Sequence, residues 1–315
     1  MSRIPTIIDS PDGTVKAVNV KRLNEMPYWL MPNLHSNAAL AASLAIVPVP
    51  PQNAIIVPAN QASPFFVMAV SGQGPAGVYA MSAQRTAACL VFLQVQDGPQ
   101  IRALMNAACH IDTIFGNYGV GARPYYLPEA LMLDENRAVL CSVTDISGAT
   151  NVVQLNLETM RLLTREYDHT LSKIRNRMEN RQYLTLPYFY TLDNGFSTLA
   201  AVLGATNTET ITIGQDHHFE IFQITAVASQ GPDSFKMNIV NADTGEPLID
   251  APLGVTQNLS SGLIVGNASF PVRFHEPRFV ELRSKLVVTL ENKVAAVNVI
   301  RLVLGGRALA DKLWK

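Results

Sequence analysis

Apolar and polar residues alternate with a period of two along several short segments of this chain, the pattern of a β-strand with one buried face. The segment 219–226 shows this alternation most cleanly, whereas 89–95 is apolar almost throughout, as in a strand covered on both faces. Strands are predicted at 55–57, 65–70, 89–95, 138–144 and 151–158, and again at 219–226, 235–240, 247–249, 285–290 and 296–304. Short strands with turns such as 241–245 between them indicate an all-β fold of antiparallel sandwiches.

Between the two sets of strands the spacing becomes helical. Apolar residues recur there at steps of four, four, three and four residues, which places them on one face of a helix. They are Leu163, Tyr167, Leu171, Ile174 and Met178. The opposite face is basic but diluted by acidic residues, which favours a solvated connector over a strip that touches nucleic acid or an acidic partner. Because Pro187 marks a stop, one connecting helix is predicted at 164–187.

The two sets of strands resemble each other in sequence. Segment 114–117 (Ile-Phe-Gly-Asn) is matched by 264–267 (Ile-Val-Gly-Asn) at an offset of 150, which is 266 minus 116. Further matches are 65–75 with 222–232 at an offset of 157 (232 minus 75), 151–157 with 298–304, Arg123 with Arg273, Pro128 with Pro277 and Leu133 with Leu282. The order is kept while the offset drifts in small steps, as loop insertions cause in a duplicated domain. We therefore expect two tandem, jelly-roll-like β-sandwiches that arose by internal duplication.

Four parts are expected along the chain. Residues 1–53 form an extended N-terminal arm with a short helix near 37–44, and 54–163 form the first sandwich. The connecting helix at 164–187 and the second sandwich at 188–315 follow, with Gly305-Gly306 closing the last strand. The stretch 100–111 has helical spacing but lacks a helical counterpart in the second copy, so strand and helix both stay open there.

Composition narrows the functional classes. Charged residues are 16% of the chain and hydrophobic ones 48%, which favours a surface partly buried against other subunits over two sandwiches that merely have large cores. The net charge of −1 gives no attraction to nucleic acid or to an anionic membrane, and no apolar run is long enough to span a bilayer. Cys89, Cys109 and Cys141 lack disulfide or metal-ligand spacing. Together with a start that lacks a secretory signal, they indicate synthesis in a reducing cytoplasm.

Signatures of catalysis are missing. No nucleophile elbow, zinc-protease helix or phosphate-binding loop occurs, and the glycines of 116–121 precede a proline rather than a helix. The adjacent His217 and His218 would point to opposite faces of a strand, and the other histidines are isolated. We therefore expect no catalytic residue, no cofactor and no metal site.

Arginines and aromatic residues gather at matching places in the two copies. Blocks 123–129 and 273–278 each join an arginine to aromatic residues and a proline, which suits either a protected sheet edge or a subunit contact. The apolar centre of the arm must likewise lie on its own domain or on a neighbouring subunit. The candidate subunit contacts are Tyr28, Trp29, Leu30, Met31, Arg123, Tyr125, Tyr126, Arg273, Phe274 and Arg278.

The end of each module carries a family resemblance. A proline-bearing run enters an apolar strand, a turn at 144–148 or 291–293 follows, and an alternating strand closes the module at 159–162 or 305–309. With two such modules in tandem, the chain resembles bacteriophage virion proteins, in particular the double jelly-roll major capsid proteins of tailless icosahedral phages. That resemblance implies a shell subunit of the virion without catalysis, made in the host cytoplasm. It also implies homo-oligomers, trimers above all, contacts with other virion proteins, no specific nucleic acid, and only indirect membrane contact.

Other functions remain open on the sequence alone. The helix and arm also fit a collar, neck or decoration protein of a tailed phage. A sandwich that binds a receptor or carbohydrate would want aromatic platforms in its loops, but the two tryptophans, Trp29 and Trp314, lie in the terminal segments. An enzyme on a cupin-like roll would want a Gly-x-His-x-His metal motif, which is missing.

Overall fold

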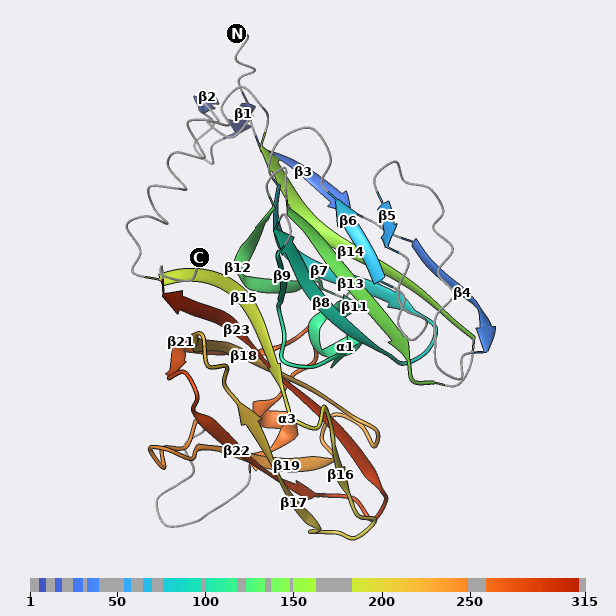
Figure 1. Cartoon of the computed structure of the whole chain (residues 1–315), viewed down its shortest axis with the longest axis vertical. Helices are drawn as coiled ribbons and strands as arrows, with labels where there is room; N and C mark the ends of the chain where they lie inside the picture. Colours follow the sequence, from blue (N-terminus) through green and yellow to red (C-terminus); the bar gives the residue numbers. More distant parts are fainter. Residues whose placement is uncertain are drawn as a thin grey trace.

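The computed structural model describes residues 6–9, 15–18, 25–30, 33–39, 54–57, 65–69, 76–97, 100–117, 123–133, 137–147, 150–162, 183–248 and 259–311. Within them the chain is almost entirely antiparallel β-sheet, folded into two sandwiches that lie one above the other in Figure 1. The expected all-β fold with two tandem sandwiches is confirmed.

The first sandwich consists of two sheets. One has the order β10-β8-β13-β6-β5, with β9 beside β8; the other has the order β11-β7-β14-β3, with β12 beside β7 and β4 beside β14. Its elements are β3 (Glu25–Leu30), β4 (Asn33–Ala39), β5 (Ala54–Val57), β6 (Phe65–Ala69), β7 (Ala76–Arg85), β8 (Cys89–Asp97), β9 (Gln100–Ala103), β10 (Cys109–His110), α1 (Ile111–Ile114), β11 (Gly116–Asn117), β12 (Tyr125–Leu133), β13 (Arg137–Asp145) and β14 (Thr150–Leu162). A separate hairpin pairs β1 (Thr6–Asp9) with β2 (Val15–Val18).

The second sandwich repeats this plan. Its sheets have the orders β15-β23-β18-β21, with β16 beside β23, and β17-β22-β19-β20. Its elements are β15 (Tyr183–Thr191), β16 (Ser197–Leu199), β17 (Thr206–Thr212), β18 (His218–Ala228), β19 (Phe235–Asn241), β20 (Leu259–Ser260), α3 (Ser261–Ile264), β21 (Val272–Val280), β22 (Lys285–Asn292) and β23 (Asn298–Asp311).

Both sandwiches are jelly rolls. If β15 and β16 are counted as one strand position, the second sandwich has eight positions in chain order. The first, eighth, third and sixth positions form one sheet, and the second, seventh, fourth and fifth form the other. The first sandwich has the same arrangement, with β3 and β4 at the first position and β14 at the eighth. Each roll therefore wraps two Greek keys into two facing sheets.

The correspondence extends to single residues. The pairing of β12 with β7 skips from Tyr126 to Leu131, and the pairing of β21 with β18 skips from Arg273 to Arg278. These two bulges match in length and position, so Tyr126 corresponds to Arg273 at an offset of 147 (273 minus 126). A glycine also pairs in parallel with each third strand, Gly116 with Ser82 and Gly266 with Thr225.

The register of strand pairing supports two of the sequence matches between the sandwiches and corrects a third. The short helices α1 and α3 precede the matched glycines, and 151–157 and 298–304 lie in the corresponding strands β14 and β23. However, 65–69 forms β6, whereas most of 222–232 lies in β18, the counterpart of β7 at an offset of 143 (225 minus 82). The match of 65–75 with 222–232 was therefore wrong.

The expected arm and connecting helix also change. Strands β3 and β4 pair with β14 and belong to the first sandwich, so that sandwich begins well before residue 54, and 37–39 are strand rather than helix. Most of the predicted connecting helix lies outside the described residues. Residues 183–187 at its end form β15, and Pro187 sits within that strand. Proline is tolerated there because β15 is the edge of its sheet.

Two further local expectations are settled. The ambiguous stretch 100–111 forms the strands β9 and β10 and the first residue of α1. Strand β23 runs on through Gly305 and Gly306 to Asp311, so these glycines do not close it. A Cβ atom on Gly306 would collide with the carbonyl of Glu220, which explains the glycine at this point of the sheet.

Two hydrophobic cores hold the sandwiches together. In the second, Leu286, Val288 and Leu290 of β22 are buried between neighbours that are more exposed, as the alternating pattern predicts. Each such side chain contributes about 1.5–3 kcal/mol when fully buried. In the first, Cys89, Cys109 and Cys141 are buried as free thiols. The first core also takes in Phe189, Ala268 and Val303 from the second sandwich, so it is completed across the domain contact.

Candidate functional site

The contact between the two sandwiches is the most elaborate site in the described part of the chain. Strand β12 and helix α1 of the first sandwich lie against the sheet of β15, β23 and β18 in the second. Backbone atoms join the two: Phe189 N–H donates to Leu104 O at 2.9 Å, and Ala268 N–H donates to Asp112 O at 2.9 Å. Asn106 adds two bonds to the backbone of Thr191, at 2.8 and 2.9 Å.

Tyr125 is the centre of this contact. It is 0% exposed, and its ring centroid lies 5.8 Å from that of Phe189. Its hydroxyl lies so close to Gly305 that a Cβ atom there would collide with it. Gly305 therefore provides the space into which Tyr125 of the other sandwich inserts.

Two arginine–aromatic pairs flank Tyr125. The guanidinium carbon of Arg123 lies 5.9 Å from the ring centroid of Phe270, and that of Arg273 lies 6.0 Å from the ring centroid of Tyr126. Tyr126 corresponds to Arg273 in the strand register, and Arg123 and Phe270 each lie three residues before them. Each pair thus joins corresponding positions of the two sandwiches. Arg123 corresponds to Phe270 and not to Arg273, so that sequence match was wrong.

The recurring Gly-Asn has a steric explanation. A Cβ atom on Gly116 would collide with the carbonyl of Arg123, and one on Gly266 would collide with the carbonyl of Phe270. In both sandwiches the chain before the sixth strand position passes tightly over this glycine. The repeated glycine is therefore a packing requirement of the roll.

An acidic side chain completes the contact. Glu129 of β12 accepts a hydrogen bond from the Thr185 hydroxyl at 2.7 Å and lies 3.8 Å from the guanidinium of Arg307. Arg307 also forms an ion pair with Glu220, and its guanidinium carbon lies 5.3 Å from the ring centroid of Phe222. These side chains are partly buried, and a partly buried ion pair gives little net stability because both charges lose contact with water.

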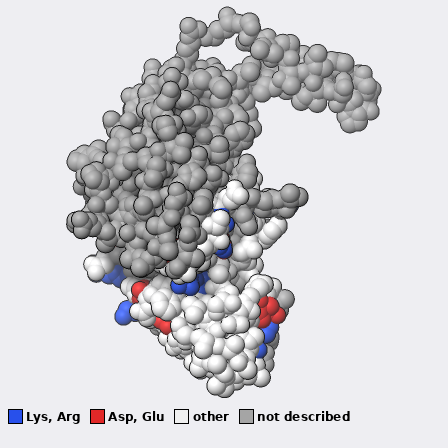
Figure 2. Space-filling view, turned by 90° about the vertical axis from the view of Figure 1, so that its right-hand side faces the viewer, with Lys and Arg blue, Asp and Glu red and all other residues white. Residues whose placement is uncertain are grey.

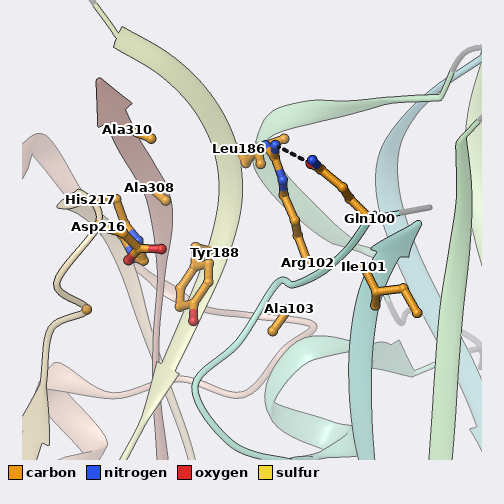
Figure 3. Close-up of a pocket in the computed structure, with 11 residues that line it drawn as sticks. Gln100, Ile101, Arg102, Ala103, Leu186, Tyr188, Asp216, His217, Ala308 and Ala310 are labelled. Carbon is orange, nitrogen blue, oxygen red and sulfur yellow. Dashed lines mark hydrogen bonds and ion pairs between the residues drawn. The ribbon is translucent and has the colours of Figure 1, made fainter. Parts of the chain in front are cut away.

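A cleft of about 570 Å³ opens beside this contact. Figure 3 shows Arg102 from β9 on the side of the first sandwich, and Tyr188, Asp216 and His217 on the side of the second. Leu186, Ala308 and Ala310 add an apolar surface. Ligand sites frequently occupy such clefts between domains, lined by apolar residues with a few polar groups.

One wall of the cleft holds a chain of hydrogen bonds. Asp216 Oδ1 lies 2.7 Å from Nδ1 of His217, and Nε2 of His217 lies 2.7 Å from the Tyr190 hydroxyl. That hydroxyl accepts from Gly214 N–H at 2.7 Å. Burial lowers the pKa of His217, and Asp216 offsets this only in part, so the imidazole is neutral at pH 7. A neutral ring that donates from Nδ1 and accepts at Nε2 satisfies the whole chain.

The role of these hydrogen bonds is to hold side chains in place. Tyr190 is 1% exposed, and burial raises the pKa of its hydroxyl, so the row of hydrogen bonds ends inside the protein rather than at the cleft. The Tyr188 ring lies 4.8 Å from both the Tyr190 and the His217 rings. These contacts hold the loop before β18 against β15 and thereby shape one wall of the cleft.

A smaller cleft of about 260 Å³ lies elsewhere along the same contact, lined by Asp112, Phe115, Ala226, Pro232 and Asn267, among others. Asp112 forms an ion pair with Arg85. His110, the N-cap of α1, accepts a hydrogen bond from Asp112 N–H at 3.3 Å. Burial lowers the pKa of His110 to about 4, against the opposing effect of Asp112.

The structure separates the predicted contact residues into groups. Tyr28, Trp29 and Leu30 lie in β3, and Met31 lies outside the described residues. Arg123, Tyr126 and Arg273 lie at the contact between the sandwiches of one chain. Tyr125 is fully buried there, so the expectation that it contacts another subunit was wrong. Phe274 is half-buried against the second core, and Arg278 is exposed.

The sequence carried a signal for this contact that the strand pattern did not reveal. Pro27-Tyr28-Trp29 pairs with 158–160 in β14, and Pro187-Tyr188-Phe189 pairs with 305–307 in β23. These two triplets therefore hold corresponding positions. Recognising the repeated Pro-Tyr-aromatic motif would have placed both first strands and the cleft residue Tyr188.

The described residues contain no group of three or more His, Cys, Asp or Glu side chains placed to hold a metal ion. No helix among them is long and apolar enough to cross a membrane.

No known protein family and no curated protein matches the sequence. Among solved structures the chain is similar to PNGF-II, with 10% identity, 90% of this chain and 66% of that chain covered, and a TM-score of 0.33. It is similar to the triple jelly-roll turret protein of an archaeal virus, with 10% identity, 97% and 82% covered, and a TM-score of 0.24. It is also similar to a β-porphyranase of Bacteroides plebeius, with 8% identity, 84% and 39% covered, and a TM-score of 0.20. The chain thus spans about two thirds of the first structure and less than half of the third. With TM-scores this low, the assignment of two jelly rolls rests on the strand order of the chain itself.

Proposed function

We propose that this protein is a structural subunit of a virus or phage particle that assembles into the shell through contacts between identical chains. The observation that carries the proposal is the pairing of two jelly rolls of matching register in one chain with 16% charged residues. An internal duplication of one module accounts for the matching bulges and helices. Such a chain presents two similar bodies from which repeated contacts can be built.

The surface of the second sandwich supports self-association. Large apolar side chains remain exposed in the loops at one end of it, where Asn292 ties two loops together by hydrogen bonds to Ala200 O and Ala296 O. The exposed residues there are Phe196 at 45%, Val202 at 61%, Leu203 at 69% and Val297 at 53%. On the face shown in Figure 2, charged side chains occur in small groups, and most of the described surface is uncharged. Low charge and exposed aromatic or aliphatic residues favour burial in an assembly.

The proposal is tested by the mass of the purified full chain in solution, measured by light scattering at several concentrations, with electron microscopy of the same sample. We expect a trimer, a larger ring or a closed shell. The symmetry of the particles distinguishes a shell subunit from a collar or decoration protein. A chain that stays monomeric at about 100 μM would contradict the proposal, because standard-size interfaces associate well below this concentration.

A second candidate function is the binding of a carbohydrate or a receptor segment, and the cleft between the sandwiches is the observation that favours it. Its volume of about 570 Å³ suits a ligand of one or two sugar rings, and Arg102, Asp216 and Tyr188 supply polar groups around an apolar floor. A glycan array followed by calorimetry tests it. Arg102→Ala should abolish any binding seen with the intact chain, whereas Leu203→Ser, remote from the cleft, should leave it unchanged.

A further inference from the structure

The cleft between the sandwiches lies beside an open sheet edge. Strand β9 pairs with β8 and with no other strand of the described residues. Gln100, Ile101 and Ala103 are exposed, with Ile101 at 56%, and Arg102 is half-buried. All four residues line the cleft. Sheet edges are usually covered or blocked, because their unpaired N–H and C=O groups can bind another strand. In the described part of the chain, β9 is an edge without such a cover.

The free backbone groups of β9 can be identified from the hydrogen bond beside it. Leu104 N–H donates to Leu93 O of β8 at 2.9 Å. Residues of an antiparallel pair direct their N–H and C=O groups alternately toward the partner strand and away from it. Residues 104, 102 and 100 therefore direct these groups toward β8. The N–H and C=O groups of Ile101 and Ala103 point away from β8, and they form the free row of this edge.

The edge of β15 lies on the other side of the cleft. Met105 and Phe189 form a parallel bridge, in which Phe189 N–H donates to Leu104 O at 2.9 Å and Asn106 N–H donates to Phe189 O at 3.2 Å. Before this bridge, β9 and β15 separate, and the cleft of about 570 Å³ lies between them (Figure 3). Two sheet edges thus meet at one end of the cleft and leave space for a further strand at the other.

The side chains of the cleft favour an extended peptide. Leu186, Ala308 and Ala310 form its apolar surface, and Arg102 and Asp216 lie on its two sides (Figure 3). Successive side chains of a strand point to opposite faces. One side chain of a bound peptide can therefore rest on the apolar surface while a neighbouring carboxylate reaches Arg102. A sugar could use these side chains, but only a peptide would also match the free backbone row of β9.

We propose that the cleft binds an extended peptide segment of a partner protein, which adds to β9 as a further strand. The segment places an apolar residue against Leu186 and a carboxylate beside Arg102. This inference rests on the second candidate function, because it names the class of ligand for the same cleft. Strand β9 has four residues, so the paired part of the segment is about four residues, or about 13 Å, long. Main-chain hydrogen bonds supply the affinity, and the alternate side chains supply the selectivity.

The first test uses random octapeptides displayed on phage and selected on the full chain. The strongest binder is synthesised with a fluorescent label, and its affinity is measured by fluorescence anisotropy. Versions with a single N-methylated amide are then compared along its length. Every second amide of an added strand points toward β9, so N-methylation should weaken binding about tenfold or more at alternate residues and only slightly at the residues between them.

The second test changes the edge itself. Ile101→Pro removes an N–H group that points away from β8, so the pairing of β9 with β8 is kept while the free row loses a donor. The matched control, Ile101→Thr, shortens the side chain and keeps the N–H group. We expect about tenfold weaker binding for Ile101→Pro and less than about a threefold change for Ile101→Thr. Circular dichroism and thermal melting check that both are folded; if Ile101→Pro is not, the N-methylated peptides on the wild-type chain decide.

The outcomes separate this inference from the function on which it rests. If N-methylation acts equally at every residue, or Ile101→Pro binds like the wild type, the addition of a strand is overturned. If glycans bind in the cleft and no peptide does, the inference is overturned and the second candidate function stands. If neither binds, both are overturned. Overlapping octapeptides of this chain are tested as competitors, and if one of them binds more tightly than every selected peptide, the occupant is a second copy and the inference of a separate partner is overturned.

Discussion

The two sandwiches share strand order and bulges, but they close their cores differently. The core of the second roll consists of its own residues, from Tyr190 to Leu304. The core of the first roll includes Phe189, Ala268 and Val303 from its neighbour. The second roll therefore has a core made of its own residues, whereas the core of the first roll depends on residues of the second. The difference arises where β12, while still paired with β7 at the edge of its own sheet, lies against the next domain with Tyr125 inserted above Gly305.

Separating the two rolls into fragments should have the largest effect on stability. A fragment of residues 183–315 should unfold cooperatively on its own, because it keeps its complete core. A fragment of residues 1–182 should lose about 5 kcal/mol of stability, since Tyr125 and its neighbours lose their apolar partners. Urea denaturation of both fragments and of the full chain, followed by tryptophan fluorescence and circular dichroism, measures this. Equal stability of the two fragments would contradict the asymmetry.

Filling the space at Gly305 should have the next largest effect. Gly305→Ala places a Cβ atom against the Tyr125 hydroxyl, and the expected loss in the free energy of unfolding is about 3 kcal/mol. Tyr125→Phe removes that oxygen and should recover part of the loss when the two changes are combined. The control is Leu203→Ala, at a loop residue that is 69% exposed, where the expected change is under about 0.5 kcal/mol. Additive effects of Gly305→Ala and Tyr125→Phe would count against the insertion.

Acid should weaken the first roll through the buried His110. Burial lowers the pKa of His110 to about 4 in the folded chain, below the usual 6.5. The unfolded chain therefore binds this proton more readily as the pH falls. The contribution of the neutral histidine is fully present above pH 6.5 and is lost between about pH 6.5 and 4. By pH 5 the loss should reach about 2 kcal/mol.

The corresponding N-cap in the second roll, Ser260, does not titrate. His110→Asn keeps a capping side chain without the titration, so it should flatten the dependence of the free energy of unfolding on pH. Urea titrations of both proteins at pH 7 and pH 5 provide the measurement. An unchanged slope in His110→Asn would assign the acid sensitivity to another group, with His217 next in line because its pKa is lowered in the same direction.

The smallest expected effect concerns the arginine–aromatic pairs. Arg273→Gln combined with Tyr126→Leu in a double-mutant cycle should yield a coupling energy of about 0.5 kcal/mol, because both groups are largely exposed. The pair of Arg301 and Phe196, 5.5 Å apart within the second roll, serves as a reference for such a contact away from the domain junction. A coupling near zero for the first pair and not for the second would show that the junction is held by Tyr125 and its apolar neighbours alone.

Most strands could be predicted because their residues alternate or are strongly apolar, as in β8, β13, β18 and β22. Strand β7 was missed because Ala76, Gly77, Ala80 and Ala83 carry none of the β-branched or aromatic side chains that mark a strand. Such small residues suit a strand in the middle of a sheet, between β14 and β12. Strand β3 was taken for part of an arm because Pro27 is unfavourable in a strand unless that strand lies at an edge.

The candidate site was less predictable than the fold. Blocks 123–129 and 273–278 stand out in the sequence, but a local pattern does not say whether an aromatic residue packs within its chain or against another one. Tyr125 turned out to be fully buried in its own chain, while Phe279, which the pattern did not single out, is 52% exposed. The cleft residues Tyr188, Asp216 and His217 come from separate elements, so their proximity depends on the pairing of β15 and β18 with β23.

By itself the sequence determined the all-β class, the tandem arrangement of two modules and most of the strands, because period and turn residues act over a few neighbours. The tertiary structure alone decided the register, the equivalence of β7 with β18, and the unequal burial of the corresponding edge strands β12 and β21. These depend on contacts between residues far apart in the chain, such as Tyr125 with Gly305 and Thr113 with Thr225. Whether an edge is covered or open is settled only when a second surface is brought against it.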